Sequence, residues 1–79
     1  MVLASMDAVR AAARGSYQLL TWPGETGEPL LLDAFTASGL VQSYNAFRKD
    51  ETRETFARMV GKSRANFGRV VEIVWSMVK

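Results

Sequence analysis

The stretch from Arg53 to Val70 constrains the fold more than any other part of the chain. Its spacing is the one that two short helices need when they cross steeply through a tight turn. Ala57 is small enough to let a second helix approach, and Gly61, four residues later, can adopt the positive φ of such a turn. Ser63 is a favourable N-cap for the second helix. The apolar residues around these positions would form the shared core: Phe56, Val60, Phe67 and Val70. The sequence therefore predicts a crossed helical pair with a three-residue turn.

Two positions inside this stretch fit the pattern less well. Lys62 stands where such a turn often has an apolar residue. Gly68 lies inside the second helix, where glycine costs about 1 kcal/mol relative to alanine. A simple helical hairpin therefore stays open as an alternative to the crossed pair.

Two more helices are expected before this stretch. An alanine-rich segment begins at Ser5, a possible N-cap, and runs to Arg14, where Gly15 closes it. The few residues before Ser5 could be disordered. A second segment opens at Asp33, again a good N-cap. Its apolar residues recur along one helical face: Ala37, Leu40, Val41, Tyr44 and Phe47. Asp50 is then expected to cap the first helix of the crossed pair.

A cluster of chain-breaking residues, Pro23–Pro29, separates two short apolar runs. The runs are residues 17–22 and 30–32, and the segment could form a β-hairpin, a loop or an arm exchanged between subunits. The main rival to strands is an extended connector that packs Trp22 onto the helices. Glu25 and Glu28 flank the glycine-rich turn, and we expect them to serve the solubility of the loop.

Seventy-nine residues are enough for one small domain. A chain of this length buries only about 60 % of its unfolded surface, so its core is thin. The prediction is a mainly α fold: a small helix-turn-helix domain with an N-terminal helix and a short extended arm or β-hairpin. The single domain spans residues 1–79, with the N-terminal helix and arm in residues 1–32 and a three-helix core in residues 33–79.

The chain contains neither Cys nor His. It therefore lacks the usual zinc ligands, thiol nucleophiles and His acid–base catalysts, and no carboxylate or Lys/Ser constellation replaces them. The run Gly61-Lys62-Ser63 looks like the end of a phosphate-binding loop, but Phe56 stands where the first glycine of that loop would be. We expect no enzyme activity, no metal, no cofactor and no small-molecule substrate.

Basic residues gather in the second half of the chain. Residues 1–47 carry a net charge of −2 and residues 48–79 a net charge of +4, with no acid between residues 58 and 69. A basic half favours an anionic partner, and the second helix of a helix-turn-helix enters the DNA major groove. There Arg can pair with guanine, Asn with adenine, and the Ala methyl can meet the thymine methyl. The expected base contacts are Ser63, Arg64, Ala65, Asn66 and Arg69, and the expected phosphate contacts are Lys49, Arg53, Arg58 and Lys62.

The run from Phe56 to Trp75 resembles the helix-turn-helix of TrfB/KorA-type plasmid transcriptional repressors. The shared features are a Phe-Ala pair at residues 56–57, a Gly-x-Ser/Thr-Arg sequence at residues 61–64 and a terminal Val-Trp at residues 74–75. In that family a dimerisation region follows the motif, and here it is missing or replaced by residues 1–32. The resemblance implies sequence-specific DNA binding and repression.

The C-terminal segment from Val70 is apolar around most of a helical circumference. Its polar residues Glu72, Ser76 and Lys79 form one narrow stripe. Such a helix is buried on most sides, under either the N-terminal arm or a second subunit. The expected core or dimer residues are Trp22, Val74, Trp75 and Val78.

A homodimer on double-stranded DNA would place two recognition helices one DNA turn apart. We expect this assembly in the bacterial cytoplasm or nucleoid, without a membrane partner, because no apolar run is long enough to span a bilayer. The alternative function is a protein–protein interaction module, such as a phage or plasmid accessory factor, that docks through the apolar C-terminal helix.

Overall fold

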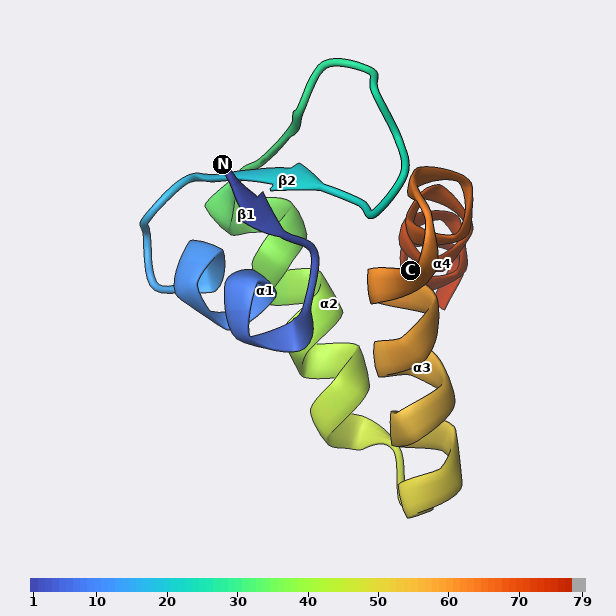
Figure 1. Ribbon diagram of the computed structural model, residues 1–79. Helices are drawn as coiled ribbons and strands as arrows, with labels where there is room; N and C mark the ends of the chain where they lie inside the picture. The colour runs from blue at the N-terminus through green and yellow to red at the C-terminus, as the bar shows by residue number, and fades with distance from the viewer. Residues whose placement is uncertain (78–79) are drawn as a thin grey trace.

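Four helices and a three-stranded sheet make up residues 1–77, the part of the chain that the structure, a computed structural model, describes. In chain order the elements are β1 (Val2–Leu3), α1 (Met6–Ala13), β2 (Gln18–Thr21), β3 (Leu30–Leu32), α2 (Ala34–Ala46), α3 (Asp50–Lys62) and α4 (Arg64–Met77) (Figure 1). The predicted mainly α fold with a β-hairpin arm is confirmed.

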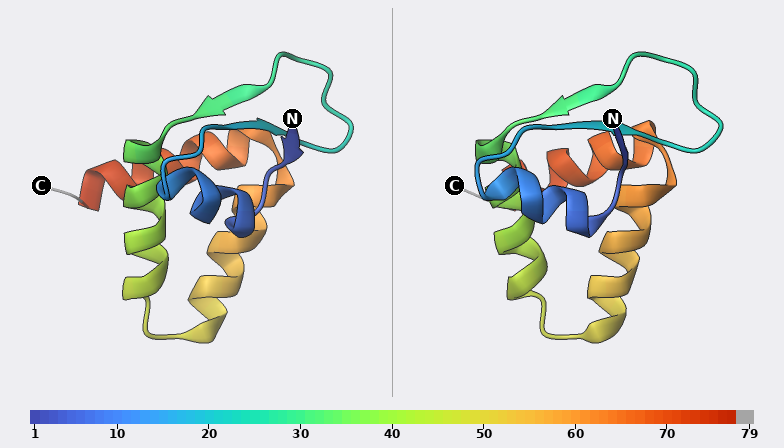
Figure 2. Two further views of the ribbon diagram at one scale, coloured as in Figure 1. Left: turned by 90° about the vertical axis from the view of Figure 1, so that its left-hand side faces the viewer. Right: turned by 60° about the vertical axis from the view of Figure 1, so that its left-hand side comes forward.

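The sheet has the order β1-β2-β3 and lies over one end of the helices (Figure 2). Strands β2 and β3 are antiparallel, with Leu20 opposite Leu30, while β1 runs parallel to β2 with Val2 opposite Leu20. Side chains alternate between the faces of a strand, so Leu20 is buried against the helices and Leu19 is exposed. The hairpin alternative is confirmed. The residues before Ser5, for which the sequence leaves disorder open, include the short strand β1, because Val2–Leu3 pairs with β2.

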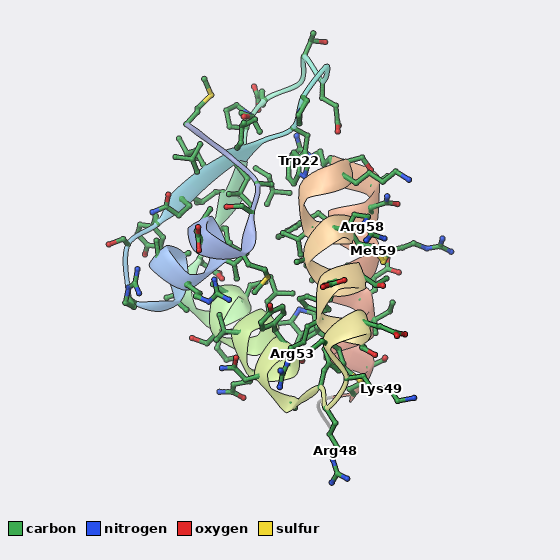
Figure 3. The ribbon with its side chains drawn as sticks, turned by 60° about the horizontal axis from the view of Figure 1, so that its bottom comes forward. Trp22, Arg48, Lys49, Arg53, Arg58 and Met59 are labelled. Carbon is green, nitrogen blue, oxygen red and sulfur yellow. The ribbon has the colours of Figure 1, made fainter. Side chains whose placement is uncertain are left out.

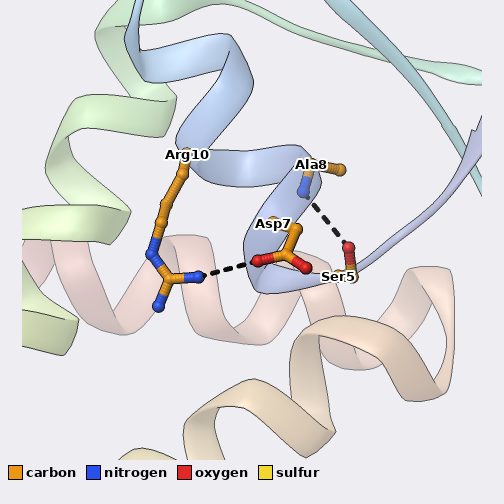
Figure 4. A network of polar contacts seen from close by, with 4 residues as sticks. All are labelled: Ser5, Asp7, Ala8 and Arg10. Atoms are coloured by element: carbon orange, nitrogen blue, oxygen red, sulfur yellow. Dashed lines mark hydrogen bonds and ion pairs between the residues drawn. The ribbon is translucent and has the colours of Figure 1, made fainter.

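Side chains at the starts of two helices satisfy free backbone donors as the sequence predicts. The Ser5 hydroxyl accepts a hydrogen bond from the Ala8 N–H at 3.1 Å, beside an Asp7–Arg10 ion pair of 3.1 Å (Figure 4). Asp33 Oδ1 accepts from the Thr36 N–H at 2.8 Å. These contacts fix where α1 and α2 begin, because the first N–H groups of a helix have no partner within it.

The cap predicted for α3 is wrong by one position. Lys49 is the N-cap and makes no side-chain capping bond, while Asp50 is already helical and pairs with Arg53 at 3.4 Å. The carboxylates of Asp50 and Glu51 lie in the first turn, where the helix dipole favours negative charge without a capping bond.

Helices α2 and α3 run antiparallel side by side, and α4 crosses their ends beneath the sheet (Figure 2). The core lies where these layers meet. Its most deeply buried side chains come from almost every element: Val9, Leu20, Leu32, Leu40, Val60, Phe67 and Val74.

The Trp22 ring packs against Phe67 with centroids 5.5 Å apart, so the residue that directly follows β2 also joins the helical core. The segment of residues 17–22 therefore contains a strand and also packs Trp22 onto the helices, so both predicted alternatives are present.

The turn between α3 and α4 is shorter than predicted. Helix α3 continues through Lys62, and only Ser63, with φ −161° and ψ 161°, leaves helical geometry. Gly61 does not have a positive φ; among residues 1–77 that conformation occurs at Gly15 and Gly24. Instead, a Cβ at Gly61 would lie 3.1 Å from the Ala4 carbonyl oxygen. The close approach of the chain before α1 therefore explains the glycine at position 61. The sharp change of direction between α3 and α4 occurs at the single extended residue Ser63.

Candidate nucleic-acid interface

The exposed face of α4 centres on Ala65 and Arg69, one helical turn apart. The opposite face is buried through Phe67, Val70 and Val74. Glu72 follows Arg69 by three residues and is also exposed, so the positive charge of this face is confined to the first half of the helix. The start of α4 therefore presents a basic outward face.

One of the predicted base-contact residues, Ser63, has a structural role at the start of α4. The Ser63 hydroxyl accepts a hydrogen bond from the Asn66 N–H at 3.1 Å, and the Ser63 carbonyl accepts from the Phe67 N–H at 2.9 Å. Asn66 itself is half-buried beside the core. Ser63 is thus the N-cap that was predicted, and its hydroxyl is engaged within the chain.

Arg64, the first residue of α4, is held by the loop between β2 and β3. Its backbone N–H donates to Glu25 Oε2 at 2.9 Å, and its guanidinium donates to the Glu28 carbonyl oxygen. The sequence predicts only a solvating role for Glu25 and Glu28, because their position in a glycine-rich loop does not indicate which helix they reach. The structure shows that they lie at the predicted interface.

The four predicted phosphate contacts fall into two groups along α3. Arg58 and Lys62 are exposed on the half of α3 that adjoins α4, whereas Lys49 is at the opposite end (Figure 3). Arg53 points toward α2, away from Arg58, and pairs with Asp50 (Figure 3). The 13 residues of α3 span about 20 Å, so the two groups are well separated. The structure therefore brings only Arg58 and Lys62 to the α3–α4 junction.

The basic surface is defined here as Arg58, Lys62, Arg64, Ala65 and Arg69. Within residues 1–77, Arg58, Lys62 and Arg69 form no ion pair. Their charges are therefore available to an anionic partner, in contrast to Arg10 and Arg53, which pair with acids on their own helices.

The predicted core or dimer residues divide between interior and surface. Trp22 is only 4 % exposed and Val74 is fully buried, while Trp75 is half-buried and stacks on Phe35 with ring centroids 5.3 Å apart. Val78 lies outside the described residues. The arm that contains β3 and the first half of α4 line an open groove, with Leu30–Leu32 on one side and Phe67, Gly68 and Val71 on the other.

The polar stripe of α4 is wider than the sequence indicates. Ile73 is 51 % exposed and Met77 54 % exposed, next to the polar Glu72 and Ser76. Ile73 also lines an open apolar groove between α3 and α4, formed with Phe47, Thr52, Thr55, Phe56, Met59 and Val70. Within residues 1–77, this part of α4 is uncovered.

Comparison of this chain with family models, with curated proteins and with solved structures gave no match. Within residues 1–77, no helix is long and apolar enough to cross a membrane. The same residues contain no group of three or more acidic side chains placed to hold a metal ion.

Proposed function

We propose that this protein is a sequence-specific DNA-binding transcriptional regulator that reads the major groove with α4. One observation carries the proposal: α4 crosses the end of α3 through a one-residue turn and presents Ala65 and Arg69 outward, with unpaired Arg58 and Lys62 at the junction. A helix in this position is what helix-turn-helix proteins insert between the DNA backbones. The resemblance of residues 56–75 to TrfB/KorA-type plasmid repressors supports a repressor acting in a bacterial cytoplasm or nucleoid.

Each residue of the basic surface has a distinct role in this proposal. Arg69 reads a guanine, the Ala65 methyl packs against a thymine methyl, and Arg58 and Lys62 bind phosphates. Arg64 and Asn66 contribute less to base recognition, because the Arg64 guanidinium is bonded to the Glu28 carbonyl oxygen and Asn66 is half-buried. Lys49 and Arg53 are left out of the proposed set, because they lie toward the other end of α3.

The proposal is tested by gel shift on random duplex DNA and on duplex selected from a library, at several salt concentrations. Arg69→Ala is expected to cost about 1–3 kcal/mol of binding to the selected duplex and to relax its sequence preference. Lys62→Ala is expected to weaken binding to all sequences and to lower the salt slope by about 1.

The matched control is Arg14→Ala, which removes the same charge from an exposed position at the end of α1. It should leave both the affinity and the salt slope nearly unchanged. If Arg69→Ala and Lys62→Ala behave like Arg14→Ala, the basic surface does not bind DNA.

A homodimer is part of the proposal, with Ile73 and Met77 of α4 at or near the subunit contact. Both side chains are more than half exposed, and apolar surface of this kind is stabilised by burial against a partner. Sedimentation velocity over a range of concentrations should show a dimer that Ile73→Glu dissociates. A monomer at every concentration contradicts this part.

The second candidate function is a protein–protein interaction module, favoured by the open apolar groove between α3 and α4 that Ile73 lines. The two candidates differ in their response to salt. A DNA-binding protein retards random duplex at low salt and releases it as salt rises, whereas an interaction module leaves the duplex unshifted at any salt concentration.

A further inference from the structure

The loop between β2 and β3, residues 22–29, lies against the first turn of α4 (Figure 2). Two hydrogen bonds join them, and both come from Arg64. The Arg64 backbone N–H donates to the Glu25 carboxylate at 2.9 Å, and the Arg64 guanidinium donates to the Glu28 carbonyl oxygen. Gly27 belongs to the same contact, since a Cβ there would lie 3.8 Å from the guanidinium.

The Glu25 carboxylate accepts a hydrogen bond from a backbone N–H at the start of α4, a kind of donor that also binds phosphate. The first N–H groups of a helix have no internal acceptor and carry a positive partial charge, so they bind phosphate oxygens and carboxylate oxygens alike. Here one of those N–H groups already has an anionic acceptor from the same chain. The guanidinium beside it, a predicted base contact, is bonded to backbone and turned toward the loop.

The loop is anchored at both ends and exposed between them. Trp22 is buried, with its indole N–H bonded to the Val60 carbonyl oxygen at 2.9 Å, and Leu30 is paired in the sheet. Residues 23–28 are all exposed, and Gly24 turns the chain with φ +78°. The loop therefore rests on α4 through exposed polar contacts, which water can replace, and it can lift without disturbing the core.

We infer that loop 22–29 is an autoinhibitory strap, in which Glu25 competes with phosphate for the N–H donor at the start of α4 and keeps Arg64 away from DNA. The inference rests on the DNA-binding function proposed above and adds its regulation. DNA binds fully only when phosphate displaces the Glu25 carboxylate, and release of the strap supplies Arg64 to the interface.

The test compares Glu25→Gln with Glu28→Gln in duplex binding. Both variants remove one negative charge from the same loop, so both gain equally from weaker long-range repulsion. Only Glu25 uses its carboxylate on α4, because Glu28 bonds Arg64 through its backbone carbonyl. Glu25→Gln is expected to bind duplex about threefold or more tightly than Glu28→Gln. Equal affinities of the two variants would overturn the strap.

A second measurement follows the contact without DNA. Hydrogen exchange of the Arg64 amide should be slow in the wild-type protein and in Glu28→Ala, and faster in Glu25→Ala, because alanine removes the acceptor whereas glutamine keeps an amide oxygen there. Equal exchange in all three proteins also overturns the inference, because the carboxylate then does not hold the amide.

The two proposals fail in different ways. The wild-type protein, Glu25→Gln and Glu28→Gln are compared in duplex binding. If none of these three proteins binds duplex in a salt-dependent manner, the DNA-binding function is wrong and so is the inhibitory role of the loop. If all three bind duplex equally and Arg69→Ala still weakens binding, the DNA-binding function stands and only the strap is wrong.

Discussion

Trp22 connects the hairpin to the crossed helices through one polar atom and one ring. Its indole N–H donates to the Val60 carbonyl oxygen at 2.9 Å. That carbonyl lies in the last turn of α3, where carbonyl groups lose their helical partners; the Arg64 N–H, four residues on, bonds Glu25 instead. The ring then packs on Phe67 of α4. One side chain thus satisfies the end of α3 and fills the core beside the start of α4.

Trp22→Phe is therefore expected to destabilise the protein by about 2–4 kcal/mol. The variant leaves a buried carbonyl without a donor and a cavity where the larger ring was. Urea unfolding followed by far-UV circular dichroism measures the loss. Trp75→Phe is the control, because Trp75 is only half-buried and stacks at the surface on Phe35. A loss no larger than that of the control would contradict the structural role of Trp22.

Asp33 gives the start of α2 a dependence on pH. The Thr36 backbone N–H, followed by the Thr36 hydroxyl, donates to the carboxylate and holds the pKa of Asp33 below its ordinary value. A lowered pKa in the folded state means that the carboxylate stabilises the fold above the ordinary pKa of about 4 and that this contribution is lost as pH falls through the folded pKa.

Asp33→Asn keeps an acceptor for the Thr36 N–H but cannot titrate. Between pH 7 and pH 3 its urea midpoint should fall less than that of the wild-type protein. Identical falls in the two proteins would show that Asp33 does not contribute to the acid sensitivity.

At the scale of elements, two glycines in consecutive helices have opposite surroundings. A Cβ at Gly68 of α4 would meet no atom within 4 Å. A Cβ at Gly61 of α3 would lie 3.1 Å from the Ala4 carbonyl oxygen, and Ala4 is fixed because its N–H donates to the Thr21 carbonyl at 2.9 Å. Both glycines are helical, so their effects on helix propensity are comparable and the difference between them comes from packing.

Gly68→Ala is expected to raise the free energy of unfolding by about 1 kcal/mol, which is the helix propensity gained. Gly61→Ala should gain less than Gly68→Ala or lose stability, because a backbone oxygen must move to admit the methyl group. Urea denaturation of both variants measures the difference. A larger gain from Gly61→Ala would contradict the close passage of the chain before α1.

The element that the sequence describes least completely is α4. Its apolar spacing predicts burial of Val70 and Val74, which the structure confirms. The exposure of Ile73 follows from how the sheet and α3 lie around the helix, and no pattern within α4 specifies it. The arm lines a groove beside Val71, and Ile73 and Met77 are exposed within residues 1–77.

In the molecule as a whole, the two oppositely charged halves of the chain contact each other. The half with net charge −2 supplies the loop that carries Glu25 and Glu28, and the half with net charge +4 supplies the helix start that receives it. The two halves meet at Arg64. Attraction between the oppositely charged halves favours this contact, and added salt screens that attraction.

Features that are satisfied within a few residues follow directly from the local sequence. Ser5, Asp33 and Ser63 cap helices because each bonds an N–H three residues ahead, and Pro23–Pro29 interrupts regular structure wherever it lies. Such local interactions depend on nothing else in the fold, so spacing alone reveals them.

Contacts between distant groups depend instead on how the hairpin packs on the helices. The Trp22–Val60 bond joins residues 38 positions apart, and the Arg64–Glu25 bond joins residues 39 positions apart. The prediction of a positive φ at Gly61 is wrong for the same reason, because the residue that Gly61 approaches closely is Ala4, 57 positions away near the start of the chain. A helix end can satisfy its free groups with any suitable partner, and the packing of the hairpin on the helices selected that partner.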